Sequence, residues 1–215
     1  MKVYFVRHGE GDHNVRKLYS HPDFSLTEKG KLQAKIAAER IKSLPIEIII
    51  SSTFKRTMQT TEVINKHLKK EVIYSDLVTE IRRPSEIAGK FQGDPEVIKI
   101  KNEMDKKFHL PNWRYSDEEN FYDFKKRALD FIKYLESLNY EHILVVTHLV
   151  FIQAVVLAMM LKENLNSEIL LRAYRFLEIE TSGLTICENK NNDWHLITWN
   201  DHAHLAENNN AKFQG

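Results

Sequence analysis

Short apolar segments that alternate with segments of helical pattern are the feature that most limits how this chain can fold. Four stretches rich in β-branched and aromatic residues are predicted to be strands: 2–6, 46–50, 71–77 and 142–148. Helical patterns occupy 25–44, 51–68 and 117–138, and a further helix follows residue 148. Apolar strands that alternate with helices are typical of a parallel sheet covered on both faces. We therefore predict an α/β fold, a three-layer α/β/α sandwich with a mostly parallel central sheet.

The sequence also indicates where some elements begin and how the sheet ends. Ser25 and Glu28 have the spacing of a capping box for the first helix, and Ser51 or Ser52 is the expected N-cap of the second. Shorter strands are expected near the end of the chain, at 175–180, 184–188 and 194–199. Because no helical pattern separates them, we expect part of the sheet to be antiparallel.

A single domain is expected to span 1–215, because the chain shows no internal repeat and no linker. The stretch 82–116 contains Pro84, Pro95 and Pro111, and we expect it to be an irregular lid or insertion. The polar tail at 206–215 is expected to be frayed.

Composition excludes several classes of partner. The chain has 31 basic and 30 acidic side chains, so its net charge of +1 favours neither nucleic acid nor a membrane surface. Its longest apolar stretch, 149–161, is shorter than the roughly 18 residues that cross a bilayer. Cys187 is the only cysteine, so no internal disulfide can form, and no signal-peptide pattern precedes the first strand. We therefore expect a cytoplasmic protein.

Charged side chains follow the predicted strands at their carboxyl ends, where open parallel sheets bind ligands. Arg7 and His8 follow the first strand, Arg56 lies in the helix after the second, Glu80 follows the third, and His148 ends the fourth. Guanidinium groups pair bidentately with phosphate oxygens. An imidazole can attack phosphorus, and a carboxylic acid can protonate a leaving alkoxide. These residue types therefore predict phosphoryl chemistry.

Six motifs are spread along nearly the whole chain: RHGEGDHN (7–14), LTEKGKLQA (26–34), SSTFKRTMQT (51–60), LVTEI (77–81), VVTHLVFIQAVV (145–156) and WNDHAHL (199–205). With these motifs the chain resembles the histidine phosphatase superfamily, also called the phosphoglycerate mutase-like family. The resemblance implies a phosphoglycerate mutase-like fold and a reaction that needs no metal and no cofactor.

The resemblance also implies a role for each matching residue. His8 would be the nucleophile and would become a phosphohistidine. Arg7, Arg56 and His148 would hold the phosphate oxygens. Glu80 would protonate the leaving group and then help water to attack the phosphoenzyme. For this chemistry we expect His8 neutral and His148 charged, so that neighbouring groups must push the two pKa values apart.

Some of these assignments have alternatives. Asp76, Glu86 and Glu10 are alternatives to Glu80 as the acid. Asn14 would be either a secondary phosphate contact or a turn residue.

The chain departs from the family pattern after Glu80. Many members have a glycine and an aromatic-rich segment there, whereas this chain reads EIRRPSEIAGKFQG (80–93). Arg82 and Arg83 are therefore either solvated loop residues or contacts to a second anionic group on the substrate.

Other kinds of site fit the sequence less well. Asn14 replaces the third glycine of a dinucleotide-binding fingerprint, and GKL at 30–32 lacks the flanking residues of a Walker loop. Asp193 stands where a cysteine-dependent phosphatase would need an arginine after Cys187. His202 and His204 beside Asp201 suggest a metal site, but they also match the last family motif, which binds no metal.

The function that the sequence favours is hydrolysis of a phosphomonoester through a phosphohistidine on His8, with a small phosphorylated substrate as the partner. The alternatives are a phosphoglycerate mutase, a protein phosphohistidine or phosphoserine phosphatase, and a binding module without turnover. The short chain favours the phosphatase over the mutase, because mutases of this family usually carry a longer insertion. The natural substrate, the lid structure and the oligomeric state stay open.

Overall fold

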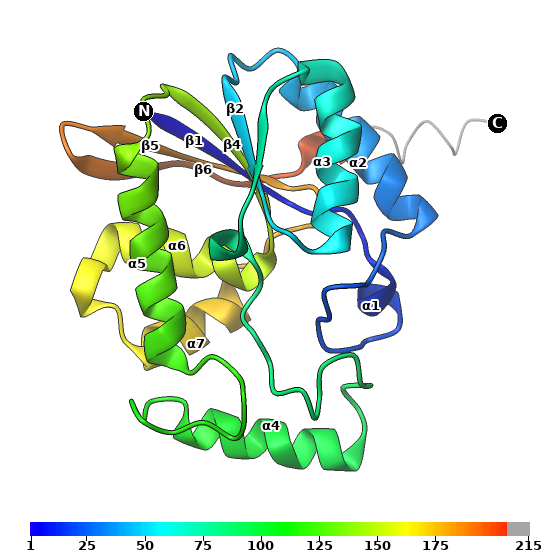
Figure 1. Ribbon diagram of the computed structural model, residues 1–215, viewed down its shortest axis with the longest axis vertical. Coiled ribbons are helices and arrows are strands. Elements are labelled where there is room, and N and C mark those ends of the chain that lie inside the picture. Colours follow the sequence, from blue (N-terminus) through cyan, green and yellow to red (C-terminus); the bar gives the residue numbers. More distant parts are fainter. Residues whose placement is uncertain (206–215) are drawn as a thin grey trace.

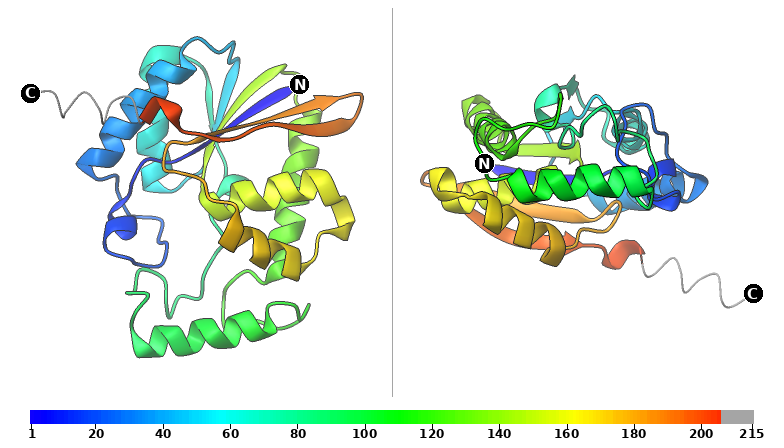
Figure 2. Two further views of the ribbon diagram at one scale, coloured as in Figure 1. Left: turned by 180° about the vertical axis from the view of Figure 1, so that it is seen from behind. Right: turned by 90° about the horizontal axis from the view of Figure 1, so that it is seen from below.

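The computed structural model describes residues 1–205, which form a six-stranded sheet in the order β3-β2-β4-β1-β5-β6 (Figure 1). The strands are β1 (Lys2–Arg7), β2 (Ile48–Ser51), β3 (Val72–Tyr74), β4 (His142–Thr147), β5 (Leu184–Lys190) and β6 (Asp193–Asp201). β4 pairs in parallel with β1 and β2, and β2 pairs in parallel with β3, whereas β5 runs antiparallel to β1 and β6. Figure 2 shows the β5–β6 hairpin from behind, at one edge of the sheet. The predicted α/β fold is confirmed; the tail predicted to be frayed, 206–215, lies outside the described residues.

Helices cover both faces of the sheet, because its strands are apolar on both sides. They are α1 (Asp12–Val15), α2 (Glu28–Ile41), α3 (Lys55–Leu68), α4 (Pro95–Lys107), α5 (Phe121–Ser137), α6 (Leu149–Leu161) and α7 (Ser167–Phe176), with 3₁₀ turns η1 (Asp76–Val78) and η2 (Lys162–Asn164). In β1, Val3 and Phe5 pack with α5 and α6, whereas Tyr4 and Val6 pack with α2 and α3 on the other face. The two helix pairs lie on opposite sides of the strands (Figure 1).

The longest apolar stretch of the sequence forms α6, which is buried from Val150 to Met159. It packs against α5, α7 and the sheet, so its apolar residues are explained by the interior of the domain. Within residues 1–205, no helix is long and apolar enough to cross a membrane.

The stretch 82–116 is not irregular throughout, so that part of the sequence prediction is wrong. It contains α4, whose N-cap Asp94 accepts a hydrogen bond from a first-turn N–H at 2.8 Å. Aspartate followed by proline at the first helical position is a start signal, and Asp94-Pro95 supplies it. α4 lies beyond the carboxyl ends of the parallel strands (Figure 1), where it contributes to a small apolar core of its own.

The predicted start of the first helix is also wrong. α2 begins after Thr27, whose hydroxyl accepts a hydrogen bond from the backbone N–H of Gly30 at 3.0 Å. Ser25 and Glu28 therefore form no capping box. The Ser25 carbonyl instead accepts from the backbone of α1, at 3.0 Å.

Neither serine predicted to cap the second helix does so. α3 begins after Phe54 and has no side-chain cap. Ser51 ends β2, where its hydroxyl accepts from Thr61 at 2.8 Å. The hydroxyl of Ser52, which was expected to cap the helix, instead forms a hydrogen bond with Nε2 of His148 at 2.8 Å.

The strand predicted at 175–180 does not form. α7 continues into its first two residues, and the rest pairs with no strand of the part that the structure describes. Side chains bind carbonyl groups of this segment: Gln153 donates to Leu177, and Arg7 donates to Ile179. The two later predicted strands are confirmed as β5 and β6.

Phe131 joins the helical layer to the sheet. It is fully buried, and its ring centroid lies 6.5 Å from that of Phe5 and 5.5 Å from that of Phe151. Phe131→Ala should lower the free energy of unfolding by about 3–5 kcal/mol, because it removes apolar contacts and leaves a cavity. Lys133→Ala, at an exposed position of the same helix, should change it by less than about 0.5 kcal/mol. Denaturant titration compares the two variants, and equal effects would contradict this account of the core.

Candidate active site

Three side chains from distant parts of the sequence meet at the carboxyl edge of the sheet. His8 follows β1, Arg56 lies in the first turn of α3 after β2, and His148 follows β4, which lies between β1 and β2. The ring centroids of the two histidines are 5.1 Å apart. At most 2% of the surface of each side chain is exposed. These three residues form what we call the buried cluster.

Arg56 links the two imidazoles of the buried cluster. Its Nε donates to Nε2 of His8 at 3.0 Å, and its Nη2 donates to Nδ1 of His148 at 3.0 Å. Further bonds hold the guanidinium in place, from Nη1 to the carbonyl of His21 at 2.9 Å and from Nη2 to the hydroxyl of Ser20 at 2.7 Å. Burial lowers the pKa of Arg56 to about 9. Such a desolvated cation favours binding of an anion, because the anion supplies a counter-charge.

The hydrogen bonds of His8 select one neutral tautomer. Its Nδ1 lies 2.7 Å from the carbonyl oxygen of Gly9, which can only accept, so Nδ1 carries the proton. Its Nε2 accepts from Arg56 and therefore carries the lone pair. Burial, followed by the positive charges of Arg56 and Arg7, lowers the pKa of His8 well below its ordinary value. His8 thus has the protonation state that a nucleophilic imidazole needs.

His148 is neutral as well, with the opposite tautomer. Its Nδ1 accepts from Arg56, so its Nε2 carries the proton and donates to the hydroxyl of Ser52 at 2.8 Å. Burial, and then the charge of Arg56, lowers the pKa of His148 well below its ordinary value. The prediction that His148 is charged is therefore wrong for the protein by itself. A phosphate dianion beside the ring would raise the pKa of His148 again.

Arg7 ends β1 beside the buried cluster. Its Nη1 donates to the backbone carbonyl of Ile179. Its Nε is buried and has no partner within residues 1–205. Burial lowers the pKa of Arg7, and the negative charges of Glu80 and Glu180 oppose this shift. Because a buried donor without a partner is costly, the N–H of Arg7 is a further group that an anion would satisfy.

Two backbone N–H groups hold the carboxylate of Glu80. Oε1 accepts from Ile81 at 3.0 Å, and Oε2 accepts from Val150 at 3.2 Å, at the positive end of α6. Burial lowers the pKa values of Arg7 and Arg56, and the negative charge of Glu80 opposes this lowering at both. Its carboxylate therefore lies close enough to act on both cations. Glu80 also lines a cavity of about 370 Å³ beside the buried cluster.

The three alternative acids are placed less favourably than Glu80. Asp76 lines the same cavity, but its carboxylate accepts from the hydroxyl of Thr53 at 2.5 Å. Glu86 is exposed, and Glu10 forms an ion pair with a lysine of α2 at 3.1 Å. Of the four carboxylates, only that of Glu80 is bound by the backbone of a helix that starts at the buried cluster.

Ser20 and Phe54 line the cavity and also contact the buried cluster. Ser20 accepts from Arg56, and the ring of Phe54 lies 5.0 Å from the Arg56 guanidinium carbon and 5.0 Å from the His148 ring centre. These two residues therefore adjoin both the cavity and the buried cluster.

Arg82 and Arg83 line the cavity together with Glu80. Arg82 is exposed, and the guanidinium carbon of Arg83 lies 5.9 Å from the ring centre of Tyr19. The side chain of Asn14 binds the turn at the start of α1, because its Oδ1 accepts a hydrogen bond from the backbone N–H of Gly11 at 2.9 Å. This is the turn role that the sequence left open for Asn14.

The sequence interpretation missed two polar residues that adjoin the buried cluster. Ser52 binds His148, but a serine before a helix resembles a cap. The ring of His13 lies 5.6 Å from that of His8, and its Nδ1 is buried without a partner within residues 1–205. Burial, and then the charges of Arg56 and Arg7, lowers the pKa of His13 to about 3. The only signal for His13 was its place inside the RHGEGDHN block.

The histidines near the end of the described chain form other contacts. His202 donates to the carbonyl of Asn200 at 2.8 Å, and His204 lies 3.2 Å from the carbonyl of Ser182. Asp201 forms an ion pair with an arginine of α2 at 3.2 Å. Within residues 1–205, no group of His, Cys, Asp and Glu side chains is arranged to hold a metal ion.

Known proteins share both the motifs and the fold of this chain. The family profile described as histidine phosphatase superfamily (branch 1) matches residues 3–202. This chain belongs to the histidine phosphatase superfamily. The predicted family is therefore confirmed over nearly the whole length of the chain.

Individual members of the superfamily differ in their named activities. Over 82 residues the chain is 40% identical to a probable phosphoglycerate mutase, GpmB, from Photorhabdus laumondii, and the match spans only 38% of each chain. The solved structure of YhfR from Bacillus stearothermophilus has a TM-score of 0.78 and 22% identity, and covers 95% of this chain and 98% of its own. A phosphoserine phosphatase from Entamoeba histolytica, solved with phosphoserine, has a TM-score of 0.74 and 23% identity at coverages of 95% and 98%. These two structures show the shared fold.

The buried imidazoles predict how stability depends on pH. Folding lowers the pKa values of His8, His13 and His148, so protonation favours the unfolded chain. The free energy of unfolding should therefore decrease as the pH falls below the unfolded value of about 6.5, by up to about 1.4 kcal/mol per pH unit for each imidazole. Denaturation at several pH values between about 7 and 5 measures this slope.

A matched pair of variants isolates the buried imidazoles. His13→Asn should make the slope shallower, because one group that protonates only on unfolding is removed. His195→Asn, at an exposed position, should leave the slope unchanged. Equal slopes in the wild type and both variants would contradict a neutral, buried His13.

Proposed function

We propose that the chain hydrolyses phosphomonoesters through a phosphohistidine on His8, without a metal ion. The observation that carries the proposal is the pair of hydrogen bonds made by the ring of His8. Gly9 holds the proton on Nδ1, and the lone pair on Nε2 is directed at the buried cation Arg56. A nucleophile and an anion-binding group thus lie 3.0 Å apart in a desolvated place.

In the first step, Nε2 of His8 attacks phosphorus and forms the N–P bond, while the P–O bond to the leaving group breaks. Arg7, Arg56 and His148 hold the non-bridging oxygens, so the Arg56–His8 hydrogen bond gives way to a bond with phosphate. The carboxylic acid of Glu80 gives its proton to the leaving oxygen. The Gly9 carbonyl keeps its hydrogen bond to Nδ1 and stabilises the positive charge that develops on the ring.

In the second step, the Glu80 carboxylate takes a proton from water. The water oxygen attacks phosphorus, the N–P bond breaks, and inorganic phosphate leaves. His8 returns to its neutral form, and Glu80 is a carboxylic acid again. One water molecule is consumed for each ester bond broken.

The cavity supports a small substrate with a second anionic group. Its volume of about 370 Å³ is in the range of small-molecule sites. Arg82 and Arg83 line it, and neither forms an ion pair with a carboxylate within the part of the chain that the structure describes. We propose that one or both bind a carboxylate or a further phosphate of the substrate. The alternative is that both arginines are solvated and bind no substrate. A protein substrate would need a cavity with a wider opening.

A phosphoglycerate mutase is the second candidate function, favoured by the 40% identity to a protein named as one. It would use the same buried cluster but return the phosphoryl group to another hydroxyl of the substrate. Without turnover, the site would act as a phosphate-binding module.

Phosphate release from 4-nitrophenyl phosphate and from 3-phosphoglycerate, with EDTA present, tests the proposal. His8→Ala should abolish release, because the nucleophile is lost. Arg56→Lys should lower kcat/KM by about 100-fold or more, because an ammonium group does not replace the planar fork that binds phosphate oxygens bidentately. Lys55→Arg, at the exposed neighbouring position, is the control and should retain activity.

The outcomes separate the candidate functions. Release that survives EDTA and vanishes in His8→Ala supports the phosphatase. No release from folded protein would contradict it, and isomerisation of phosphoglycerate after priming with a bisphosphate would then identify the mutase. Phosphate binding without either reaction would identify the binding module.

The proposed second anion site predicts a difference between substrates. Arg83→Ala should raise KM for 3-phosphoglycerate by about tenfold, because a charge-assisted hydrogen bond is lost. It should leave KM for 2-glycerophosphate, which has no second anionic group, nearly unchanged. Lys90→Ala, an exposed change in the same stretch, is the control. An equal effect on both substrates would show that Arg83 does not recognise a second anion.

A further inference from the structure

Within residues 1–205, the segment that carries Glu80 pairs with no strand of the sheet, yet side chains bind its backbone carbonyls. We call residues 77–82 the acid loop. The carbonyl of Val78 accepts from the hydroxyl of Thr147 at 2.5 Å, next to His148. The other carbonyls from residue 77 to residue 80 all accept from one side chain, that of Arg127 on α5.

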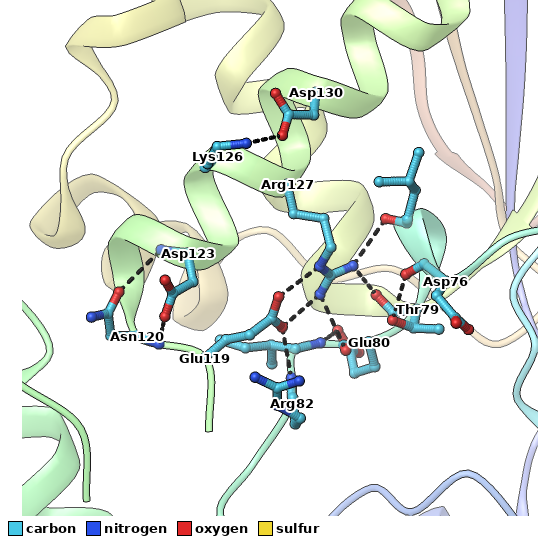
Figure 3. Close-up of polar contacts among 12 residues, drawn as sticks. Asp76, Thr79, Glu80, Arg82, Glu119, Asn120, Asp123, Lys126, Arg127 and Asp130 are labelled. Carbon is cyan, nitrogen blue, oxygen red and sulfur yellow. Dashed lines mark hydrogen bonds and ion pairs between the residues drawn. The ribbon is translucent and has the colours of Figure 1, made fainter. Parts of the chain in front are cut away.

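Arg127 binds the acid loop with two of its nitrogens (Figure 3). Nη1 donates to the carbonyls of Leu77 at 3.0 Å and Thr79 at 2.8 Å, and Nη2 donates to the carbonyl of Glu80 at 3.3 Å. The guanidinium also packs against two neighbouring aromatic rings, 4.9 Å from the centre of Phe124 and 5.1 Å from that of Phe151. Its orientation is therefore fixed by packing as well as by hydrogen bonds.

Glu119 completes the link between α5 and the acid loop. Its carboxylate pairs bidentately with Arg127, from Nε to Oε1 and from Nη2 to Oε2, both at 2.7 Å. Oε2 also accepts from the backbone N–H of Arg82 at 2.9 Å, and the Glu119 N–H donates to the Arg82 carbonyl at 3.2 Å. The side chains of Arg127 and Glu119 are only 13% and 10% exposed. The pair thus holds the loop on both sides of Glu80 (Figure 3).

We propose that Arg127 and Glu119 are positioning residues that hold Glu80 where it can donate a proton to the leaving group. Arg127 fixes the backbone up to and including Glu80, and Glu119 fixes it two residues later. The carboxylate of Glu80 then reaches the first turn of α6, which starts directly after His148. A shift of the loop would move the acid relative to the buried cluster without changing the nucleophile. This inference rests on the proposed phosphatase function.

The leaving group gives a test that general loss of structure would not reproduce. kcat/KM reports the transfer of the phosphoryl group to His8, and only a poor leaving group needs the acid in that step. Arg127→Met and Glu119→Gln should lower kcat/KM about tenfold or more for 2-glycerophosphate, whose leaving group is an alkoxide. Both should change it less than about twofold for 2,4-dinitrophenyl phosphate, whose leaving group departs without a proton.

Two further variants complete the experiment. Glu80→Gln should show the same dependence on the leaving group, and adding Arg127→Met to it should cause no further loss for 2-glycerophosphate. Lys126→Met removes an exposed ion pair to Asp130 on the same helix, at 2.5 Å, and should leave both substrates unaffected. If Arg127→Met fails to fold, Glu119→Gln, which keeps the shape of the side chain, provides the test.

The failures are distinguishable. Equal losses for both substrates, or an additive loss in the double variant, would contradict a positioning role and leave the phosphatase function standing. A wild-type chain that releases phosphate from neither substrate would overturn the proposed function, and this inference with it.

Discussion

The hydrogen bonds of Arg56 to both imidazoles are the interaction on which the rest of the site depends. A guanidinium can only donate, so each histidine must turn an acceptor nitrogen toward it. That choice puts the proton of His8 on the side of Gly9 and the proton of His148 on the side of Ser52. The guanidinium is buried and forms no ion pair with a carboxylate within residues 1–205, so a phosphate dianion is the ligand that would supply its counter-charge.

The topology of the sheet creates this arrangement. β4 lies between β1 and β2, so the residues that follow these strands meet at one edge. The proposed acid reaches the same place on a loop that Arg127 of α5 binds at three carbonyls and that Thr147 at the end of β4 binds at one. Because most of these bonds come from α5, we expect substitutions at Arg127 to change proton donation while the buried cluster stays intact.

Much of this arrangement could be predicted from the sequence, because apolar strands and the residues after them follow simple rules. The sheet and the positions of Arg7, His8, Arg56 and His148 at one edge followed from those rules, and the family followed from its motifs. Tertiary contacts decided the rest. Gly9 is an example: a Cβ there would lie 2.3 Å from the carbonyl oxygen of Gly30, so close backbone packing requires glycine. The charge state of His148 likewise depends on burial, which no local pattern records.

Arg127 did leave a signal in the sequence that was not used. It lies three residues after Phe124 and four before Phe131, on the apolar stripe of a helix, where a charged side chain needs a buried partner.

The most direct test of the central claim is to trap the phosphoenzyme by rapid quenching with a labelled phosphomonoester. The account predicts an acid-labile, alkali-stable phosphoryl group on the peptide that contains His8. Turnover with the label on another residue, or with no phosphoenzyme at all, would contradict it.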